Sequence, residues 1–393
     1  MKEMIYLDNA ATTKTRQEVV DAMLPYFTEY YGNASAVYDF GAKAREAMDR
    51  SRETIGEILH TDAGNIYFTA GGSESDNWAL RGIAEACSDR GRHIITTAIE
   101  HHAVLHTCQY LEKQGFEVTY LPVDEEGKIS LEELRRAIRE DTILISVMFA
   151  NNEIGTIEPI RQIGEIAHER GVLFHTDAVQ AFGQVPIDVE EMQIDLLSAS
   201  GHKFGGPKGV GFLYIRKGVK IRPLIYGGAQ EKKRRAGTEN VPGIVGLGKA
   251  AEIAAETMES RARQETKLRD YLIDEVLRRV PYTRCNGSRD DRLPNNASFC
   301  FRFIEGESLL IMLDMKGICG SSGSACTSGS LDPSHVLLAI GLPHEIAHGS
   351  LRLTLGEDTT KEDIDRTIEA ICEIVERLRG MSPLYEDFAK KHS

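Results

Sequence analysis

The sequence predicts an α/β protein with a mainly parallel sheet, joined to a smaller α+β domain. Between about residues 16 and 255, short apolar runs alternate with amphipathic helical runs, the pattern of a parallel sheet covered on both faces. A long charged helix follows at about 249–280, and strand-like runs resume only beyond it. We therefore expect a large domain over residues 16–255 and a small domain formed by residues 1–15 and 256–393.

The large domain contains seven strand candidates, separated mostly by helices such as the one predicted after the Ser130 cap. The candidates are NIYFTA (65–70), HIITTA (93–98), EVTYLPV (117–123), TILISVMFA (142–150), VLFHTDA (172–178), LLSAS (196–200) and GVGFLYI (209–215). In open α/β sheets, ligands bind at the carboxyl ends of the strands. Four polar residues lie at or just past such ends and are therefore candidate site residues: His101, Asn152, Asp177 and Lys203.

The small domain is predicted from two strand-like runs and a closing helix. NASFCFRF (296–303) and SLRLTL (350–355) read as strands. The last amphipathic run places five apolar residues on one helical stripe: Ile364, Ile368, Ile371, Val375 and Leu378. A patch rich in glycine and serine, CGSSGSACTSGS (319–330), lies between the two strands.

Composition excludes several classes of function. The net charge of -14 argues against binding to nucleic acid, which requires a basic surface. No stretch reaches the roughly 18 apolar residues of a membrane span, and the first residues, MKEMIYLDNAATT, do not form a secretory signal. The chain has seven cysteines, an odd number, and contains no CxxC pair, which predicts free thiols rather than disulfides or a zinc ribbon. We expect a cytoplasmic protein.

Lys203 stands among residues too small to cover it, in SASGHKFGGPKG (198–209). A partly desolvated lysine can act as an amine nucleophile. Pyridoxal phosphate enzymes need such a lysine for a Schiff base, together with an acidic partner for the pyridine nitrogen. Asp177 in HTDAVQ suits that role, although an aspartate there is also typical of a helix N-cap.

A phosphate group needs backbone donors at the start of a helix. FTAGGSESDNWAL (68–80) supplies a strand, two glycines, a hydroxyl and then a helix, so Gly71, Gly72 and Ser73 are candidates to hold the anion. Glycine turns before helices are common, and this motif alone does not specify a ligand.

Taken together, the motifs resemble the cysteine desulfurase family (NifS/IscS-like), a branch of the class V aminotransferases within the fold-type I pyridoxal phosphate enzymes. The motifs that carry this resemblance are YLDNAATT (6–13), ESDN (74–77), EHHAVL (100–105), NNEIGT (151–156), HTDAVQAFG (175–183), SGHKFGGPKGVG (200–211), RRAGTENV (234–241), SSGSACTSGSLDPSHVL (321–337) and LRLTLG (351–356). The resemblance covers nearly the whole chain. It implies a large domain built on a seven-stranded sheet and a small domain that carries the catalytic cysteine loop.

The resemblance also implies roles in cofactor binding. Lys203 would hold pyridoxal phosphate as a Schiff base and move the substrate proton. Asp177 would pair with the pyridine nitrogen, Gln180 would bond the phenolic oxygen, and His101 would lie on the ring and assist acid–base steps. The phosphate would be held by Gly72, Ser73, Ser200 and His202, and by Thr238 of a neighbouring subunit, which implies a homodimer.

For the substrate, the resemblance implies L-cysteine. Asn152, which would also contact the cofactor, and Arg352 would bind its carboxylate side. Cys326 would attack the substrate sulfur, leaving L-alanine and a persulfide for a sulfur acceptor, an iron–sulfur scaffold or another thiolation route. A thiolate with this task needs exposure and access, which a loop of glycine and serine provides.

Other interpretations remain open at this point. Selenocysteine lyase or another class V aminotransferase or lyase is the alternative enzyme, and transamination would not need Cys326. A non-catalytic scaffold would be expected to lack the lysine or the thiol. His102 and His106, four apart on a predicted helix, could suggest a metal site, but the family assigns them no role and we expect no metal.

Overall fold

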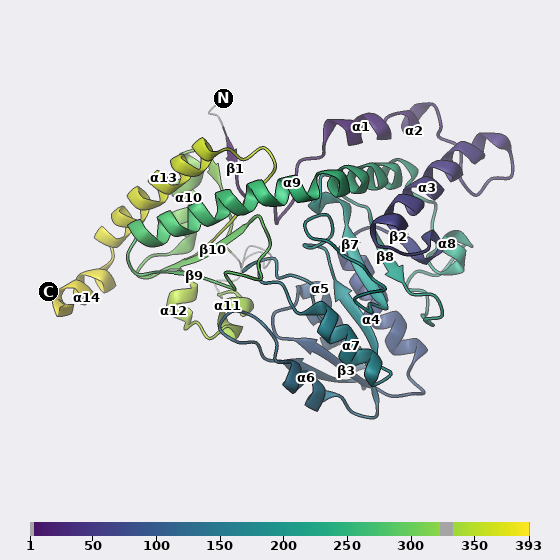
Figure 1. Cartoon of the computed structure of the whole chain (residues 1–393), viewed down its shortest axis with the longest axis horizontal. Coiled ribbons are helices and arrows are strands. Elements are labelled where there is room, and N and C mark those ends of the chain that lie inside the picture. Colours follow the sequence, from purple (N-terminus) through teal and green to yellow (C-terminus); the bar gives the residue numbers. More distant parts are fainter. Residues whose placement is uncertain (1–3, 323–332, 393) are drawn as a thin grey trace.

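A computed structural model describes residues 4–322 and 333–392 of the chain, and its centre is a seven-stranded sheet (Figure 1). The strand order is β2-β8-β7-β6-β5-β3-β4, and β8 runs antiparallel to both neighbours whereas the other pairings are parallel. The strands are β2 (Ile66–Thr69), β3 (His93–Thr97), β4 (Glu117–Leu121), β5 (Thr142–Ser146), β6 (Leu173–Asp177), β7 (Leu196–Ser200) and β8 (Gly211–Ile215). The predicted mainly parallel sheet is confirmed.

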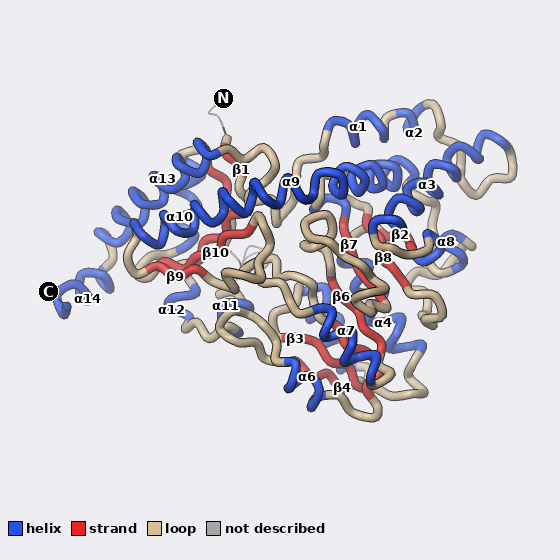
Figure 2. The backbone as a smooth tube through the Cα atoms, in the orientation of Figure 1, coloured by secondary structure: helices blue, strands red, loops and turns tan. Residues whose placement is uncertain are grey.

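Helices cover both faces of this sheet, as Figure 2 shows. Because strand side chains alternate between faces, Phe212 and Tyr214 enter one hydrophobic cluster while Leu213 enters another. The first cluster is covered by α3, α7 and the start of α9, and the second by α4 and α5. The helices of this part are α1 (Gln17–Met23), α2 (Pro25–Thr28), α3 (Asp39–Ile58), α4 (Gly72–Ala86), α5 (His102–Lys113), α6 (Leu131–Ala137), α7 (Ile160–Glu169) and α8 (Gln230–Lys233), with 3-10 turns η1 (Ala63–Asn65) and η2 (Gly201–Lys203).

The remaining strands form two small sheets. β12 (Ser350–Thr354), β10 (Asn296–Phe301) and β9 (Thr283–Cys285) form an antiparallel sheet, and β1 (Ile5–Tyr6) pairs in parallel with β11 (Ile318–Cys319). The helices of this part are α10 (Gly306–Met315), α11 (His335–Ala339), α12 (His344–Ala347), α13 (Lys361–Gly380) and α14 (Pro383–His392). The predicted stripe on the closing helix is present, since Ile364, Ile371 and Val375 are buried in one cluster with strands β10 and β12.

The long helix α9 (Val241–Arg279) crosses from the core of the large sheet to the core of the small one (Figure 1). It begins at Val241, eight residues before the start expected from the sequence, because the Asn240 side chain accepts a bond from the Gly243 amide and caps the helix. Glycines in its first turns allow close packing: a Cβ at Gly248 would lie 2.6 Å from Ser51 of α3. Residue 255, our proposed domain boundary, lies inside this continuous helix.

Within the described part of the chain, no helix combines the length and the apolar character needed to cross a membrane.

Candidate functional site

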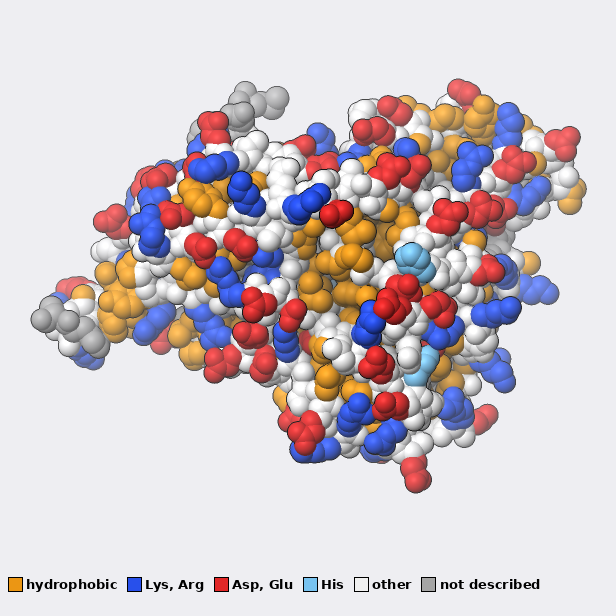
Figure 3. Space-filling model, viewed as in Figure 1, with side chains coloured by type: hydrophobic (Ala, Val, Ile, Leu, Met, Phe, Trp, Pro, Cys, Tyr) orange, Lys and Arg blue, Asp and Glu red, His pale blue; other side chains and the backbone are white. Residues whose placement is uncertain are grey.

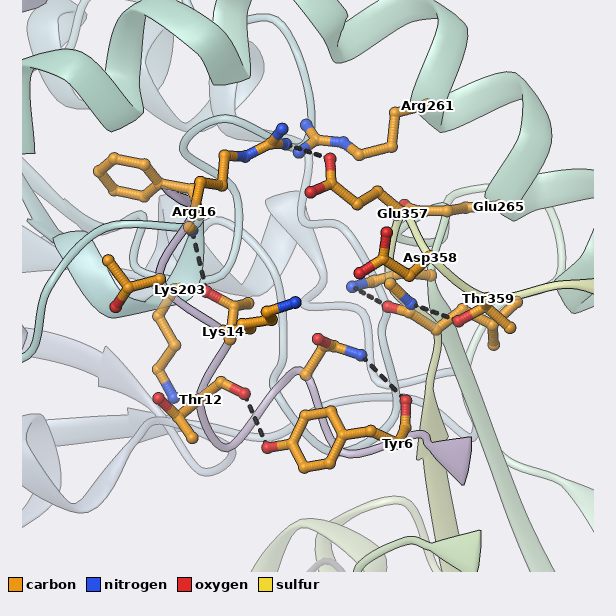
Figure 4. Close-up of a pocket in the computed structure, with 18 of the residues that line it drawn as sticks. Tyr6, Thr12, Lys14, Arg16, Lys203, Arg261, Glu265, Glu357, Asp358 and Thr359 are labelled. Carbon is orange, nitrogen blue, oxygen red and sulfur yellow. Dashed lines mark hydrogen bonds and ion pairs between the residues drawn. The ribbon is translucent and has the colours of Figure 1, made fainter. Parts of the chain in front are cut away.

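Lys203 lies in the turn η2, directly after the carboxyl end of β7. Its Nζ donates hydrogen bonds to the carbonyl oxygens of Ala10 (2.5 Å) and Ala11 (2.8 Å). These residues form a turn at the start of the segment 8–16. The segment is held next to η2 by Thr13, whose amide donates to the His202 carbonyl. The lysine is half-buried and points toward this segment (Figure 4).

Asp177 ends β6, the strand next to β7 in the sheet, so the two carboxyl ends meet as predicted for parallel neighbours. Its Oδ1 accepts a bond from the Val179 amide at 2.9 Å, and the chain continues in turns rather than in the helix that an N-cap would require. Burial raises the pKa of the Asp177 carboxyl, and the Lys203 ammonium opposes the rise. The Gln180 side chain donates to the Ala10 carbonyl at 3.0 Å, the same oxygen that Lys203 contacts.

His101 caps the start of α5, where its Nδ1 accepts a bond from the Ala103 amide at 3.1 Å. In the neutral ring this acceptor role leaves the proton on Nε2. Burial lowers the pKa of His101, and the Lys203 ammonium lowers it further. His101 is therefore a neutral imidazole whose Nε2 can donate a hydrogen bond.

The phosphate candidates surround the first turn of α4. Gly71 has φ of 148°, a conformation that favours glycine, and a Cβ at Gly72 would lie 2.5 Å from the Val179 side chain. Ser200 is buried beside both glycines, and His202 Nδ1 lies 3.1 Å from the Thr12 hydroxyl. Ser73 is exposed at the helix start, and Thr238 is exposed on the loop before α9.

These residues fit the cofactor that the resemblance implies. The start of α4 has no side-chain cap, so its first backbone amides are available next to the buried Ser200, which suits a phosphate. Asp177 provides a buried carboxylate for a ring nitrogen, and the amine of Lys203 lies at the adjacent strand end.

Arg352 lies on β12 of the small sheet with its side chain turned toward the large one. Its Nη1 donates to the backbone carbonyl of Asn152 at 3.0 Å and its Nη2 pairs with Asp8 at 2.8 Å. Nε is buried and makes no hydrogen bond to any described residue. Arg352 and Asn152, the two residues predicted to bind the substrate carboxylate, thus contact each other through the Asn152 backbone, and the guanidinium retains donor capacity.

Cys326 lies outside the described residues, but the described chain on either side of it reaches the site. Ser321 exchanges backbone hydrogen bonds with Arg352 at 3.0 and 2.6 Å. On the other side, His335 lies with its Nε2 3.0 Å from the carbonyl oxygen of Glu100, the residue before His101.

Several residues of the site were not among the candidates selected from the sequence, although some lie in the motifs quoted above. Asp8 meets Arg352 across 344 positions of sequence, and the carbonyl of Ala10 is a backbone group. Below Asp177 lies a buried polar cluster, in which His175 hydrogen-bonds Ser146 at 2.8 Å and Ser198 at 3.0 Å, and approaches Asp76 at 3.7 Å. Burial, together with the charge of Asp177, raises the pKa of Asp76. A polar residue in a strand sequence does not show which residue of another strand or helix it will contact, so this cluster could not be predicted.

A cavity of about 740 Å³ is lined by Lys203 and by part of the segment that it contacts (Figure 4). Lys203, Arg16, Arg261 and Glu265 line it, but Asp177, His101 and Arg352 do not. This cavity is therefore separate from the cluster of predicted site residues, apart from Lys203.

Near His101, the rings of His102 and His106 stack with centroids 4.9 Å apart, and the His335 ring is tilted against that of His102 at 4.8 Å. Within residues 4–322 and 333–392, no group of three or more histidine, cysteine, aspartate or glutamate side chains is arranged to hold a metal ion.

The chain is similar to known proteins of one family. The family model described as Aminotransferase class-V matches residues 5–367. The chain is 62% identical over 380 residues to "Cysteine desulfurase IscS" of Methanosarcina thermophila, covering 97% of this chain and 94% of that protein. It is 58% identical over 392 residues to "Cysteine desulfurase IscS" of Clostridium botulinum, covering 99% of both. A solved structure titled "NIFS-LIKE PROTEIN" superposes with a TM-score of 0.90 at 41% identity, covering 96% of this chain and all of that one.

Proposed function

The chain belongs to the class V aminotransferase family, as a pyridoxal phosphate-dependent cysteine desulfurase, and we propose how its own residues carry out that reaction. When bound, the cofactor supplies an electron-withdrawing ring that weakens the bonds at the α-carbon of the amino acid. The residues described below bind, orient and exchange protons around it.

The observation that carries the proposal is the central position of the Lys203 ammonium. Besides burial, its charge lowers the pKa of both His101 and His202, and it opposes the rise in the pKa of Asp177. The Lys203 amine therefore lies close enough to interact electrostatically with three of the predicted cofactor contacts, His101, His202 and Asp177. Such a lysine can bind the cofactor covalently and, once released, carry a proton at Nζ to and from the substrate.

Asp177 and His101 complete the proposed cofactor contacts. A buried carboxylate at the pyridine nitrogen keeps that nitrogen protonated, and the Asp177 side chain is kept in orientation by the Val179 amide. The His101 ring, fixed by its bond to the Ala103 amide, presents Nε2–H as a donor or proton relay. Gln180 gives one amide hydrogen to the Ala10 carbonyl, and its second amide hydrogen can donate to the phenolic oxygen.

Arg352 and Asn152 would bind the substrate carboxylate. A guanidinium binds a carboxylate through two parallel hydrogen bonds, and Arg352 is fixed for this task by Asp8 and the Asn152 carbonyl. Its buried Nε is a donor available to such a ligand. Asp8 therefore acts as a positioning residue for the arginine.

Cys326 would accept the sulfur. Its thiolate attacks the sulfur of the bound cysteine, an S–S bond forms, the C–S bond breaks, and the carbon fragment takes up a proton to leave as L-alanine. The product is a Cys326 persulfide, and the step is balanced without an external oxidant or reductant. A later thiol acceptor takes the outer sulfur by exchange.

The test is to incubate the loaded protein with L-cysteine and quantify both alanine and protein-bound sulfur by mass measurement. We expect one alanine for each sulfur transferred. Alanine formed only from selenocysteine would favour the lyase alternative, and a keto acid product in place of alanine would favour an aminotransferase.

We also propose a homodimer, because Thr238 would serve the phosphate of a neighbouring subunit and is exposed in the single chain. An apolar surface lies near it, seen at the upper right of Figure 3 over α1 and α2. Its exposed side chains include Leu24, Phe27, Tyr31, Val37, Tyr38 and Phe40, and Tyr226 is exposed on the segment before α8. Exposed apolar patches of this kind are typical of subunit interfaces. Light scattering should give twice the mass of the chain.

Three further assignments are part of the proposal. The persulfide would supply an iron–sulfur scaffold or another sulfur acceptor. A cytoplasmic location is supported by the six described cysteines, all free thiols. The domain division at residue 255 is supported by the separate hydrophobic clusters on the two halves of α9.

A further inference from the structure

The loop that carries Thr238 follows α8, a short element with an uncommon backbone conformation. Glu231, Lys232 and Lys233 all have positive φ, between 45° and 66°, although none is glycine. The conformation is maintained by Glu231, whose buried carboxylate receives two bonds from Arg52 of α3, at 2.7 and 2.8 Å, and one from the Phe68 amide at 3.0 Å. The start of the loop is thus fixed to the large sheet.

The end of the loop is fixed by a second ion pair, between Arg235 and Glu74. Arg235 donates through Nε at 2.8 Å and Nη2 at 3.1 Å to the two carboxylate oxygens of Glu74. This two-pronged geometry is the stronger form of an arginine–carboxylate pair. Both side chains are largely shielded, with 22% and 15% of their surfaces exposed. The hydrogen bond to Glu74 raises the pKa of Arg235, although burial acts to lower it.

The position of Glu74 raises an electrostatic problem. It lies in the first turn of α4, two residues after Gly72, and one of its oxygens accepts a bond from the Ala70 amide, just before the glycines. A carboxylate at that point repels a phosphate dianion bound at the same helix start, in a partly shielded setting where charges interact strongly. An arginine bound to both oxygens cancels this repulsion.

We propose that Arg235 is a positioning residue for phosphate binding: it neutralises Glu74 beside the phosphate site and connects that site to the loop that carries Thr238. The inference rests on the proposed role of the α4 start as the phosphate site. Through this pair, the loop that would reach the neighbouring subunit is attached to the phosphate site of its own subunit.

The test compares pyridoxal phosphate with pyridoxal, which lacks the phosphate, in titrations of the full-length chain stripped of cofactor. The Arg235→Gln variant should bind pyridoxal phosphate about tenfold more weakly and pyridoxal unchanged, because only the phosphate meets the exposed carboxylate charge. Glu74→Gln should bind pyridoxal phosphate no more weakly than the wild type. The double variant Glu74→Gln/Arg235→Gln should recover most of the affinity for pyridoxal phosphate that Arg235→Gln loses. Arg235→Lys, which keeps the positive charge, should retain most of the wild-type affinity.

The matched control is Arg278→Gln, which removes an exposed arginine–glutamate pair from α9 and should leave both affinities unchanged. An equal loss of affinity for both ligands in Arg235→Gln, or no recovery in the double variant, would overturn the inference. If Arg235→Gln does not fold, the affinity of the double variant for pyridoxal phosphate is compared with that of Glu74→Gln. An affinity more than about threefold weaker in the double variant contradicts neutralisation of Glu74 as the role of Arg235. If the wild type itself binds the two ligands equally, the proposed phosphate site is wrong.

Discussion

Gln180 and Lys203 donate to one acceptor, the carbonyl oxygen of Ala10, at 3.0 and 2.5 Å. The segment that offers this carbonyl is also attached to the small sheet, where the Ala10 amide donates to the Thr354 hydroxyl at 2.8 Å. Lys203, which also donates to Ala11, must give up at least one of its two bonds to form a Schiff base, whereas Gln180 keeps a second amide hydrogen for a cofactor. The segment therefore connects the proposed cofactor lysine to β12, the strand that carries the proposed substrate arginine.

The first prediction concerns the substrate carboxylate. Arg352→Lys should raise KM for L-cysteine at least about tenfold with a smaller change in kcat, because an ammonium cannot reproduce the planar two-pronged contact. Steady-state kinetics with cysteamine, which lacks the carboxylate, provide the control. The variant should lose the preference of the wild type for cysteine over cysteamine, and an unchanged preference would exclude Arg352 as the carboxylate ligand.

The second prediction separates two neighbouring thiols. Cys326→Ala should abolish the persulfide and reduce turnover with cysteine by at least about 10²-fold, since no other thiol is expected in its place. Cys319→Ala is the matched control, because Cys319 lies in β11 and pairs with Tyr6 of β1. Mass spectrometry of the cysteine-treated proteins should find the extra sulfur in the control only. Sulfur retained on the Cys326→Ala chain would contradict the assignment.

The third prediction concerns pH. Glu100 is fully buried, and burial raises its pKa to about 8, although the Met148 amide and the Thr97 hydroxyl donate to it. The folded state therefore holds this proton from about pH 4.5 to 8, where the unfolded state has lost it. The free energy of unfolding should fall as pH rises across this window, by up to about 1.4 kcal/mol per pH unit from this group, and level off above it. In denaturant titrations, the free energy of unfolding of Glu100→Gln should change less between pH 5 and 8 than that of the wild type. The two changes should differ by ~1 kcal/mol or more. Identical profiles would show that Glu100 titrates normally.

The fourth prediction concerns stability. Glu231→Gln breaks a buried two-pronged pair with Arg52 and should lower the free energy of unfolding by about 3–5 kcal/mol. Glu275→Gln, in the exposed pair with Arg278, should cost at most about 1 kcal/mol. Urea unfolding of the three proteins gives the comparison. Equal costs would mean that the Arg52 pair contributes no more than a surface pair.

Much of the fold could be predicted because its strands are short, apolar and regularly spaced. LLSAS (196–200) was expected as a strand and is β7, Leu196–Ser200. The strands β1, β9 and β11 were not predicted, because two or three residues carry no periodicity. The early start of α9 was also missed, because Gly243, Gly246 and Gly248 indicate a loop. In the fold, Gly246 lies against Met23 of α1 and Gly248 against Ser51 of α3.

Some features of the candidate site could likewise be predicted from the sequence, and others could not. Asp177 and Lys203 could be selected because they follow strands, and the sheet topology makes those strands neighbours. The pairing of Asp8 with Arg352, or of Arg235 with Glu74, spans 344 and 161 positions of sequence. No local pattern encodes such a contact, and only the packing of the two sheets and of the loop before α9 brings the partners together.

The most direct measurement is to locate the cofactor on the chain. The loaded protein is treated with borohydride, which makes the bond between amine and aldehyde permanent, and its peptides are analysed by mass spectrometry. We predict the mass of the reduced cofactor on Lys203 alone, and none in Lys203→Ala treated in the same way. The label on another lysine, or a labelled Lys203→Ala chain, would contradict the account.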